Sequence, residues 1–387
     1  MEEIELSSVD EFEQDRLAIN KAISKLIRYL VIITILLGGI YWYKDKVQFD
    51  EIAFHQREKD LVFAAYLNKV DGLPRKETPK EIPVNSKETP VKKVSAKKLE
   101  FDFTNLAIPR KDMLSGGVPK NKIPALINPK MLSASEDTYI NDDDEVAGLS
   151  IDGEAHAFPL RILNYHEAVN TKVGNHSVAI TYCPLCKSLV AYDRIHNDQE
   201  LTFRISGQLF NSNVLLYTEG QKDDPLYSQM MNTQISGENS GNKLKIIPIE
   251  LTSWKSWKKR YPDTKVMSAK SKFYRNYTVN PYYTYFLTEK LMFPIKKHDD
   301  RHPRKAIVLG LWSGDTFQAY PVREFVMDAK SKEINVTINN KNVTIYYDND
   351  AKSLRVVKAD KGVEWMYSFW FAWYAFHPET ELYSASR

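Results

Sequence analysis

The only two cysteines of this 387-residue chain, Cys183 and Cys186, lie three positions apart in the stretch TYCPLCKSLVAYDR. Two thiols at this spacing can close a small disulfide ring that reopens readily, which is redox chemistry. The same thiols can bind zinc or, outside the cytoplasm, copper(I). A disulfide across so short a loop removes little chain entropy, so a purely structural clip is the weakest of the three explanations.

Three residues near the pair are candidates for tuning it. His166, on an expected helix in LNYHEAVN, is suited to shuttle a proton or to bind a metal together with the cysteines, although a lone helical histidine is more often a hydrogen-bonded packing residue. Tyr182 directly precedes the first cysteine. Lys187 directly follows the second, where its charge can stabilise a thiolate at Cys186. Cys183 is the expected nucleophile.

A complete zinc site needs four ligands, and the sequence holds no second cysteine pair. No cofactor is therefore certain, and copper or zinc bound by a mixed set with histidine or methionine is the alternative. Met230 and Met231 offer thioethers, but core filling is the safer prediction for both. The charged run KHDDRHP, which contains His298 and His302, is expected to be a solvated loop.

The elements that must position the pair are repeated once along the chain. VAGLSIDGEAHAFPLRIL, from Val146, aligns without gaps with VLGLWSGDTFQAYPVREF, from Val308. VAITYCPLCKSL, from Val178, aligns with VTIYYDNDAKSL, from Val343. A third pair, WKSWKKRYPDTKVMS and WFAWYAFHPETELYS, follows in the same order, with tryptophans that are expected to be core residues. Three ordered blocks predict two tandem, diverged copies of one unit.

The second copy predicts the local structure of the first. Its residues Asp348 to Ala351 stand where the first copy has CPLC, and they have strong turn chemistry between the β-type runs VTIYY and SLRVV. The cysteines are therefore expected at the tip of a β-hairpin that presents both sulfurs, and the second copy should have a bare turn. This differs from a thioredoxin-type site, in which the CxxC motif opens a helix.

The predicted fold is α+β and predominantly β, with two tandem repeats that form a pseudo-symmetric, two-lobed body behind one transmembrane helix. The first lobe, with the CPLC motif, is expected over residues 99–290, and the second, without cysteines, over residues 291–387. Short helices are expected in LRILNYHEAVN and SWKSWKKR.

The apolar run LIRYLVIITILLGGIYWY, residues 26–43, is just long enough to cross a bilayer and has no cleavage site behind it. We expect an uncleaved signal anchor rather than the buried helix of a soluble protein. Basic residues on its N-terminal side place residues 1–25 in the cytoplasm by the positive-inside rule. The body is then periplasmic or otherwise extracytoplasmic, on a single-pass protein of the cell (inner) membrane.

Residues 44–98 are expected to form a juxtamembrane helix and then a spacer rich in proline and lysine. The net charge is +3 with both signs interspersed, which argues against nucleic acid as a partner. The expected partners are the membrane, through the one N-terminal helix, and a protein that exchanges thiols and disulfides.

Several blocks, ILNYHEAVN, VAITYCPLCKSLVAYDR, FRISGQLFNSNVLLY and PLYSQ, resemble an uncharacterised prokaryotic family classified only as a domain of unknown function. The resemblance runs from about Ile108 to the C-terminus, and the family signature is a TYCPLC-type motif. Some members are described as selenoproteins, so the resemblance implies redox chemistry rather than a passive clip. Members often have glycine in place of Lys187, and tryptophan is usual in place of Tyr227.

The sequence thus predicts a membrane-anchored extracytoplasmic protein with a redox-active CxxC dithiol, similar to a thiol–disulfide oxidoreductase. The first alternative is a copper- or zinc-binding protein that uses the Cys pair with histidine or methionine. The second is a non-catalytic scaffold with a structural disulfide.

Overall fold

The computed structural model describes residues 101–384 except 138, 220–223, 274 and 327–331. The expected tail, anchor and spacer, residues 1–98, lie outside the described residues. Within the described ranges, no helix has both the length and the apolar character needed to span a bilayer. All of these residues belong to one compact unit.

Strands dominate the described part of the chain, so the prediction of a predominantly β fold is confirmed. The described α-helices are five and short: α2 (Leu160–His166), α3 (Trp254–Arg260), α4 (Tyr283–Phe286), α5 (Arg323–Val326) and α6 (Trp370–Phe376). The helices predicted in LRILNYHEAVN and SWKSWKKR correspond to α2 and α3. A 3-10 turn, η1 (Arg110–Asp112), precedes the first strand.

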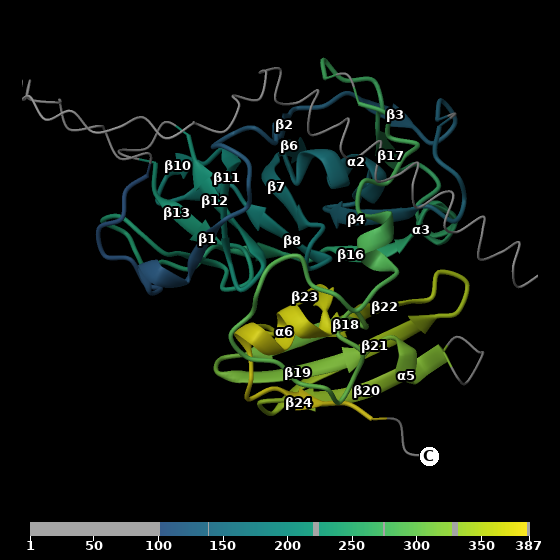
Figure 1. The fold of residues 1–387 in the computed structure, drawn as a ribbon. Helices are drawn as coiled ribbons and strands as arrows, with labels where there is room; N and C mark the ends of the chain where they lie inside the picture. The colour runs from purple at the N-terminus through teal and green to yellow at the C-terminus, as the bar shows by residue number, and fades with distance from the viewer. Residues whose placement is uncertain (1–100, 138, 220–223, 274, 327–331, 385–387) are drawn as a thin grey trace, which may run out of the picture. The chain divides into compact units, whose positions relative to one another are not determined.

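A nine-stranded sheet joins strands from the two halves of the chain (Figure 1). Its order is β2 (Leu126–Ile127), β6 (Ala168–Val173), β7 (His176–Cys183), β8 (Ser188–Asp193), β23 (Glu364–Phe369), β18 (Ile307–Ser313), β19 (Thr316–Pro321) and β24 (Glu381–Leu382), with β15 (Ile246–Ile247) beside β8. The halves meet where β23 pairs with β8, at Tyr367 and Leu189. The cysteine hairpin, β7 and β8, therefore lies at the centre of this sheet.

Four smaller sheets complete the described fold. One has the order β1 (Met113–Ser115), β11 (Phe203–Phe210), β12 (Asn213–Thr218), β13 (Leu226–Ser228) and β14 (Thr233–Gln234). Another has the order β16 (Glu250–Ser253), β4 (Glu145–Ile151), β5 (Glu154–Pro159), β17 (Lys265–Met267) and β3 (Met131–Ser133). The remaining two consist of β20 (Lys332–Ile338), β21 (Lys341–Asp348) and β22 (Ser353–Ala359), and of β9 (Ile195–His196) and β10 (Gln199–Glu200).

One set of strand pairings occurs twice. In the first half, β16 pairs with β4, β4 pairs with β5, and β17 adds to β5 in parallel. In the second half, β23, β18, β19 and β24 have the same relations in the same order. The helices α3 and α6 follow the corresponding strands β16 and β23. We call these the first set and the second set.

A tryptophan covers a glycine in each set. A Cβ atom at Gly148 would lie 2.3 Å from the ring of Trp257, and one at Gly310 would lie 2.2 Å from the ring of Trp373. Each indole Nε1 donates to the hydroxyl of a threonine further along the chain, over 2.8 Å and 2.9 Å. Only glycine allows so close an approach, and the prediction that these tryptophans are core residues is confirmed, since both are buried.

Candidate functional site

The two cysteines lie at the tip of the hairpin that β7 and β8 form. Cys183 ends β7 and pairs with Ser188, the first residue of β8. Backbone bonds from Cys186 to Cys183 (3.1 Å) and from Lys187 to Pro184 (3.4 Å) close the turn. Lys187 has a φ of 47°, in the left-handed region that favours glycine. The predicted hairpin is confirmed.

The corresponding turn between β21 and β22 shows which side-chain group this turn geometry stabilises. There, the carboxylate of Asp348 accepts hydrogen bonds from the N–H groups two and three residues further on, over 2.9 Å and 3.0 Å. In the cysteine turn, the N–H groups at the same places, those of Leu185 and Cys186, bond to the sulfur of Cys183. Both turns therefore direct two N–H groups at one side chain. A negative charge is favoured there, on a carboxylate in one turn and on a thiolate in the other.

The sulfurs are not presented to solvent. Cys183 is 1% exposed and Cys186 is 0% exposed, both within a large apolar core cluster. The expectation that the hairpin tip presents both sulfurs is therefore wrong. The reason is that other segments pack over the tip. The two thiols do face each other, since a side-chain hydrogen bond joins them, and neither is in a disulfide.

A second hairpin tip, between β11 and β12, packs against the pair. Cys186 Sγ donates to the carbonyl of Ser212 over 3.2 Å, and the N–H of Val214 bonds to the sulfur of Cys183. Ser212 has a φ of 65°, a left-handed conformation that is strained for serine. Strained backbone of this kind persists where the surrounding structure holds it in place, commonly at functional sites. Here the left-handed conformation of Ser212 directs its carbonyl oxygen toward the thiol of Cys186.

A buried polar network fixes the two tips to each other. Gln229 Oε1 accepts from Ser188 Oγ (2.6 Å) and from Asn213 Nδ2 (3.0 Å), while its Nε2 donates to Thr181 Oγ1 (3.1 Å). All four residues are fully buried. These bonds join the cysteine turn to the β11–β12 turn, while Asn213 Oδ1 has no hydrogen-bond partner among the described residues.

A connecting segment, residues 268–306, covers the turn from another side and carries α4. Tyr285 OH donates to the carbonyl of Leu185, between the two cysteines, over 2.8 Å. Lys305 Nζ donates to the carbonyls of Tyr285, Thr288 (2.5 Å) and Lys290 (2.8 Å) and lies 3.4 Å from the centroid of the Tyr285 ring. Burial lowers the pKa of Lys305 to about 8, against the opposing effect of Glu289. Lys305 thus holds the cover of the cysteine turn in place.

The two thiols have different acidities. Burial opposes ionisation at Cys183, but hydrogen bonds from Cys186 and from the backbone N–H groups of Cys186, Val214 and Leu185 lower its pKa below the ordinary value. Burial and the adjacent Cys183 raise the pKa of Cys186 well above the ordinary value. The pair therefore takes its first negative charge on Cys183, and the single proton of Cys186 is shared between the Cys183 sulfur and the Ser212 carbonyl. This agrees with the expected nucleophile.

Glu167, which the sequence reading did not select, lies beside the pair. It ends α2 with a φ of 55°, and its carbonyl accepts from the N–H of Tyr182, one residue before Cys183, over 2.8 Å. Its side chain is 6% exposed. Burial, and then the charge of Cys183, raise the pKa of its carboxyl well above the ordinary value. The carboxyl is thus buried within electrostatic range of Cys183 and holds its proton more tightly than an ordinary glutamate does. Its place after His166 in ILNYHEAVN was the available signal.

Both ring nitrogens of His166 hydrogen-bond to groups other than the cysteines. Its Nδ1 donates to the carbonyl of Pro124 over 2.7 Å, and its Nε2 accepts from the hydroxyl of Tyr277 over 2.7 Å. Burial lowers its pKa to about 4, with Arg275 acting in the same direction and the Pro124 carbonyl opposing it. The imidazole is therefore neutral at pH 7, and both of its nitrogens have partners other than the cysteines.

The comparisons with known proteins give one match. A family model described as "Protein of unknown function (DUF3179)" matches residues 120–380, more than half of the chain. The chain belongs to this family. Neither the curated proteins nor the solved structures contain a match to it. The motifs that carried the resemblance, TYCPLCKS, FNSNV and PLYSQ, meet in the DUF3179 domain as the cysteine turn, the β11–β12 turn and the strand that leads to Gln229.

In the DUF3179 domain, Tyr182 lines a small cavity, and Lys187 contacts two other residues that line it. The cavity has a volume of ≈ 180 Å³, and Tyr182, Glu145 and Phe286 are among its lining residues. Among the described residues, no group hydrogen-bonds the buried hydroxyl of Tyr182. Lys187 Nζ pairs with Glu145 over 2.6 Å and lies 5.4 Å from the centroid of the Phe286 ring. The positive charge of Lys187 is thus directed to a carboxylate.

The other candidate ligands lie apart. Met230 is fully buried in the apolar core, as predicted, and Met231 packs at the edge of a second core cluster. His298 is exposed in the KHDDRHP run, and His302 is half-buried. In the parts of the DUF3179 domain that the structure describes, no three His, Cys, Asp or Glu side chains are grouped to hold a metal ion.

Proposed function

We propose that the protein is a membrane-anchored, extracytoplasmic redox protein in which Cys183 and Cys186 interconvert between a dithiol and a disulfide. The observation that carries this proposal is the hydrogen bond between the two thiols, with backbone N–H groups directed at Cys183. Thiols placed to bond with each other, one of them with a lowered pKa, are the arrangement that disulfide exchange requires.

The proposed reaction is a two-electron exchange with a disulfide-bearing partner protein. The Cys183 thiolate attacks one sulfur of the partner disulfide and forms a mixed disulfide, which releases a partner thiolate. Cys186 then loses its proton and attacks Cys183, so that the internal disulfide forms and the second partner thiolate leaves. Both electrons pass to the partner. The proton of Cys186 passes to the partner thiolate that the first step released, so the exchange ends with one thiol and one thiolate on the partner.

Because both sulfurs are buried, the proposed exchange requires the connecting segment to move. Replacing Lys305 with Met removes the ammonium that binds the carbonyls of Tyr285, Thr288 and Lys290. We expect K305M to raise the rate at which 5,5′-dithiobis(2-nitrobenzoate) reacts with the pair by about tenfold, since local opening limits that reaction.

The control for K305M is K297M, which removes an exposed lysine from the same segment. It should leave the rate unchanged. Equal rates in K305M and the unaltered protein would show that the pair is reached by another route.

Redox titration of the full chain in glutathione buffers tests the proposal directly. We expect a two-electron transition above about −300 mV, the range of labile rather than structural disulfides. A pair that stays oxidised far below this value, with substitutions that change only thermal stability, would favour the scaffold with a structural disulfide. The burial of both sulfurs is the observation that favours that second candidate.

Metal analysis after expression with copper or zinc separates the remaining alternative. We expect no stoichiometric metal. Metal that co-purifies and is lost in Cys183→Ser would establish a metal-binding protein in place of the redox protein. His166 would not complete that site without releasing Pro124 or Tyr277.

The proposed location rests on the apolar run at residues 26–43, with residues 1–25 in the cytoplasm and residues 44–98 as helix and spacer. We also propose that residues 99–290 and 291–387 are diverged copies that form a pseudo-symmetric pair of lobes. The shared pairings of the first and second sets support this. Protease added outside a sealed inner membrane should digest the body of the protein. Digestion that occurs only after the inner membrane is opened would contradict the proposed location.

A further inference from the structure

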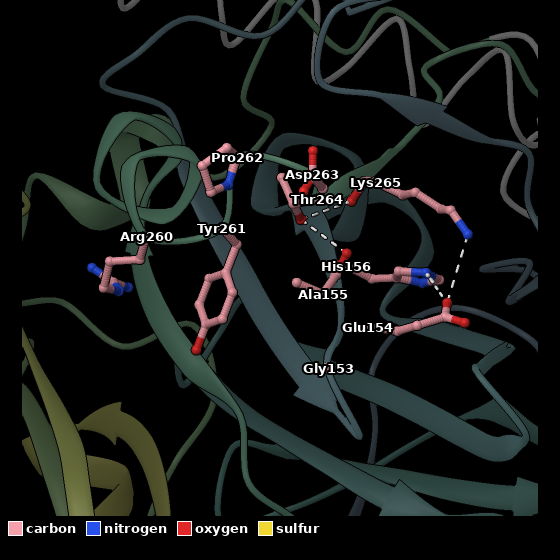
Figure 2. Close-up of a pocket in the computed structure, with 10 residues that line it drawn as sticks. All are labelled: Gly153, Glu154, Ala155, His156, Arg260, Tyr261, Pro262, Asp263, Thr264 and Lys265. Carbon is pink, nitrogen blue, oxygen red and sulfur yellow. Dashed lines mark hydrogen bonds and ion pairs between the residues drawn. The ribbon is translucent and has the colours of Figure 1, made fainter.

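A second, larger cavity of the DUF3179 domain lies beside the parallel pair of β5 and β17. Its volume is ≈ 340 Å³, and it is lined by residues 153–156 and 260–265, which include neither cysteine. Pockets that bind small molecules have volumes of about 300–1,000 Å³. In Figure 2, the small side chain of Ala155 lies between Tyr261 on one side and His156 on the other.

The second set provides a reference for this place. Its strands β19 and β24 form the same parallel pair, with Gln318 opposite Glu381 where the first set has His156 opposite Lys265. Residues around β5 therefore correspond one for one with those around β19, and residues around β17 with those around β24. The two sets can be compared side chain by side chain.

An aromatic ring fills the corresponding place in the second set. Phe317 stacks on His377, with ring centroids 4.2 Å apart and an interplanar angle of 19°. Ala155 stands at the position of Phe317, and Tyr261 at the position of His377. Tyr261 packs on Trp257 at 4.3 Å, but no ring comes from Ala155 to stack on it. The cavity thus stands where the second set has an aromatic ring and the first does not.

The side chain of His156 beside the cavity lacks the hydrogen bond that its counterpart in the second set makes. His156 is 4% exposed, and neither of its ring nitrogens has a hydrogen-bond partner among the described residues. The nearest carboxylate oxygen, of Glu154, is 3.6 Å from Nε2. In the second set, Gln318 Nε2 donates to Glu381 over 2.8 Å. Because consecutive residues of a strand point to opposite faces, the His156 ring lies on the face of β5 away from Ala155, and its buried nitrogens are closed off from the space beside Tyr261.

The residues that line the cavity carry two charges of each sign, on Glu154, Asp263, Arg260 and Lys265. Lys265 Nζ lies 3.6 Å from Glu154, as Figure 2 shows, and Arg260 pairs with Glu250 and, at 3.5 Å, with Asp348. Burial, with Lys265 acting in the same direction, lowers the pKa of His156, so its ring is neutral at pH 7. The surroundings therefore favour a ligand without net charge.

We propose that this cavity is a binding site for an uncharged planar ligand whose aromatic or heteroaromatic ring stacks on Tyr261, in the place that the Phe317 ring takes beside His377 in the second set. The site is separate from the cysteine turn, and the proposal does not depend on the redox function.

Binding of benzimidazole tests the proposal, because this molecule is a planar heteroaromatic ring without net charge at pH 7. The full chain in detergent is used for equilibrium dialysis, with empty micelles as the blank. We expect saturable binding of one equivalent, and binding of cyclohexanol, which is not planar, about tenfold weaker or more. No saturable binding of benzimidazole would refute the site.

Two substitutions locate the bound molecule. Ala155→Phe supplies the ring that the second set contains and should abolish benzimidazole binding, while Ala155→Ser leaves the space open and should retain it. If Ala155→Phe does not fold, Tyr261→Leu serves instead, and we expect it to weaken binding about tenfold through loss of the stacked ring. Binding that survives Ala155→Phe, or that Tyr261→Leu leaves unchanged, would overturn the proposal.

Discussion

In a Cys186→Ser variant, Cys183 is expected to react with iodoacetamide at pH 7 about 100-fold faster than Cys186 reacts in a Cys183→Ser variant. Only the thiolate is alkylated, and the two sulfurs differ in what stabilises it. Cys183 accepts from backbone N–H groups, and the hydroxyl of a serine at position 186 can replace the thiol donor. Cys186 instead faces the carbonyl of Ser212, and burial outweighs the one hydrogen bond that favours its thiolate, from the side chain of Asn213.

Each variant is the control for the other, because the two thiols are equally buried beneath the same cover. Differences in access therefore cancel. As pH rises, the alkylation rate of Cys183 should reach its plateau at a pH below the ordinary cysteine pKa. The alkylation rate of Cys186 should still increase at a pH above that value. Equal rates with the same pH dependence would mean that both thiols react only after the turn has opened into water, where the folded geometry no longer distinguishes them.

The second large effect is expected for Glu167→Gln, in the dependence of stability on pH. Burial raises the pKa of Glu167 in the folded state, so the folded protein binds more protons than the unfolded chain as pH rises above the unfolded pKa. The free energy of unfolding then falls with pH, by about 1.4 kcal/mol per pH unit, until the folded pKa is reached. Glutamine has nearly the same shape and does not ionise, so this loss should disappear.

Urea unfolding of the reduced full chain at pH 5, 6, 7 and 8 measures this effect. The unaltered protein should lose stability across the series, and Glu167→Gln should lose less, so that the variant becomes the more stable protein at the upper end. Asp315→Asn, which removes an exposed acid in the turn between β18 and β19, is the matched control and should follow the unaltered protein. A Glu167→Gln curve parallel to that of the unaltered protein would show that Glu167 is ionised in the fold.

The local structure around the cysteines was predictable because it is encoded in adjacent residues. The DNDA turn predicted a hairpin at the aligned CPLC stretch, and the structure has one there, with Lys187 and Lys352 both in the left-handed conformation. The aligned tryptophan blocks likewise fall on elements with the same pairings. Turn preference and strand alternation depend on neighbours within a few positions, so a single sequence contains them.

Burial of the cysteine pair could not be predicted from the neighbouring residues in the sequence. Val214 and Tyr285, which contact the turn, come from segments far along the chain, and nothing near CPLC indicates that they return to it. His166 and Glu167 are adjacent, yet the end of α2 turns the first toward Tyr277 and the second toward Cys183. From the sequence, His166 is the candidate because the ordinary pKa of histidine suits proton transfer, whereas the fold turns it away from the cysteines and buries Glu167 within electrostatic range of Cys183.

What the sequence determined by itself was the predominantly β fold, the hairpin that carries the cysteines and the family to which the chain belongs. What the tertiary structure alone decided was the environment of each side chain: the N–H groups at Cys183, the acid beside it, and the space that Ala155 leaves beneath Tyr261. The physical reason is that ionisation and cavity formation depend on which distant segments exclude water from a group, and that is settled only when those segments pack together.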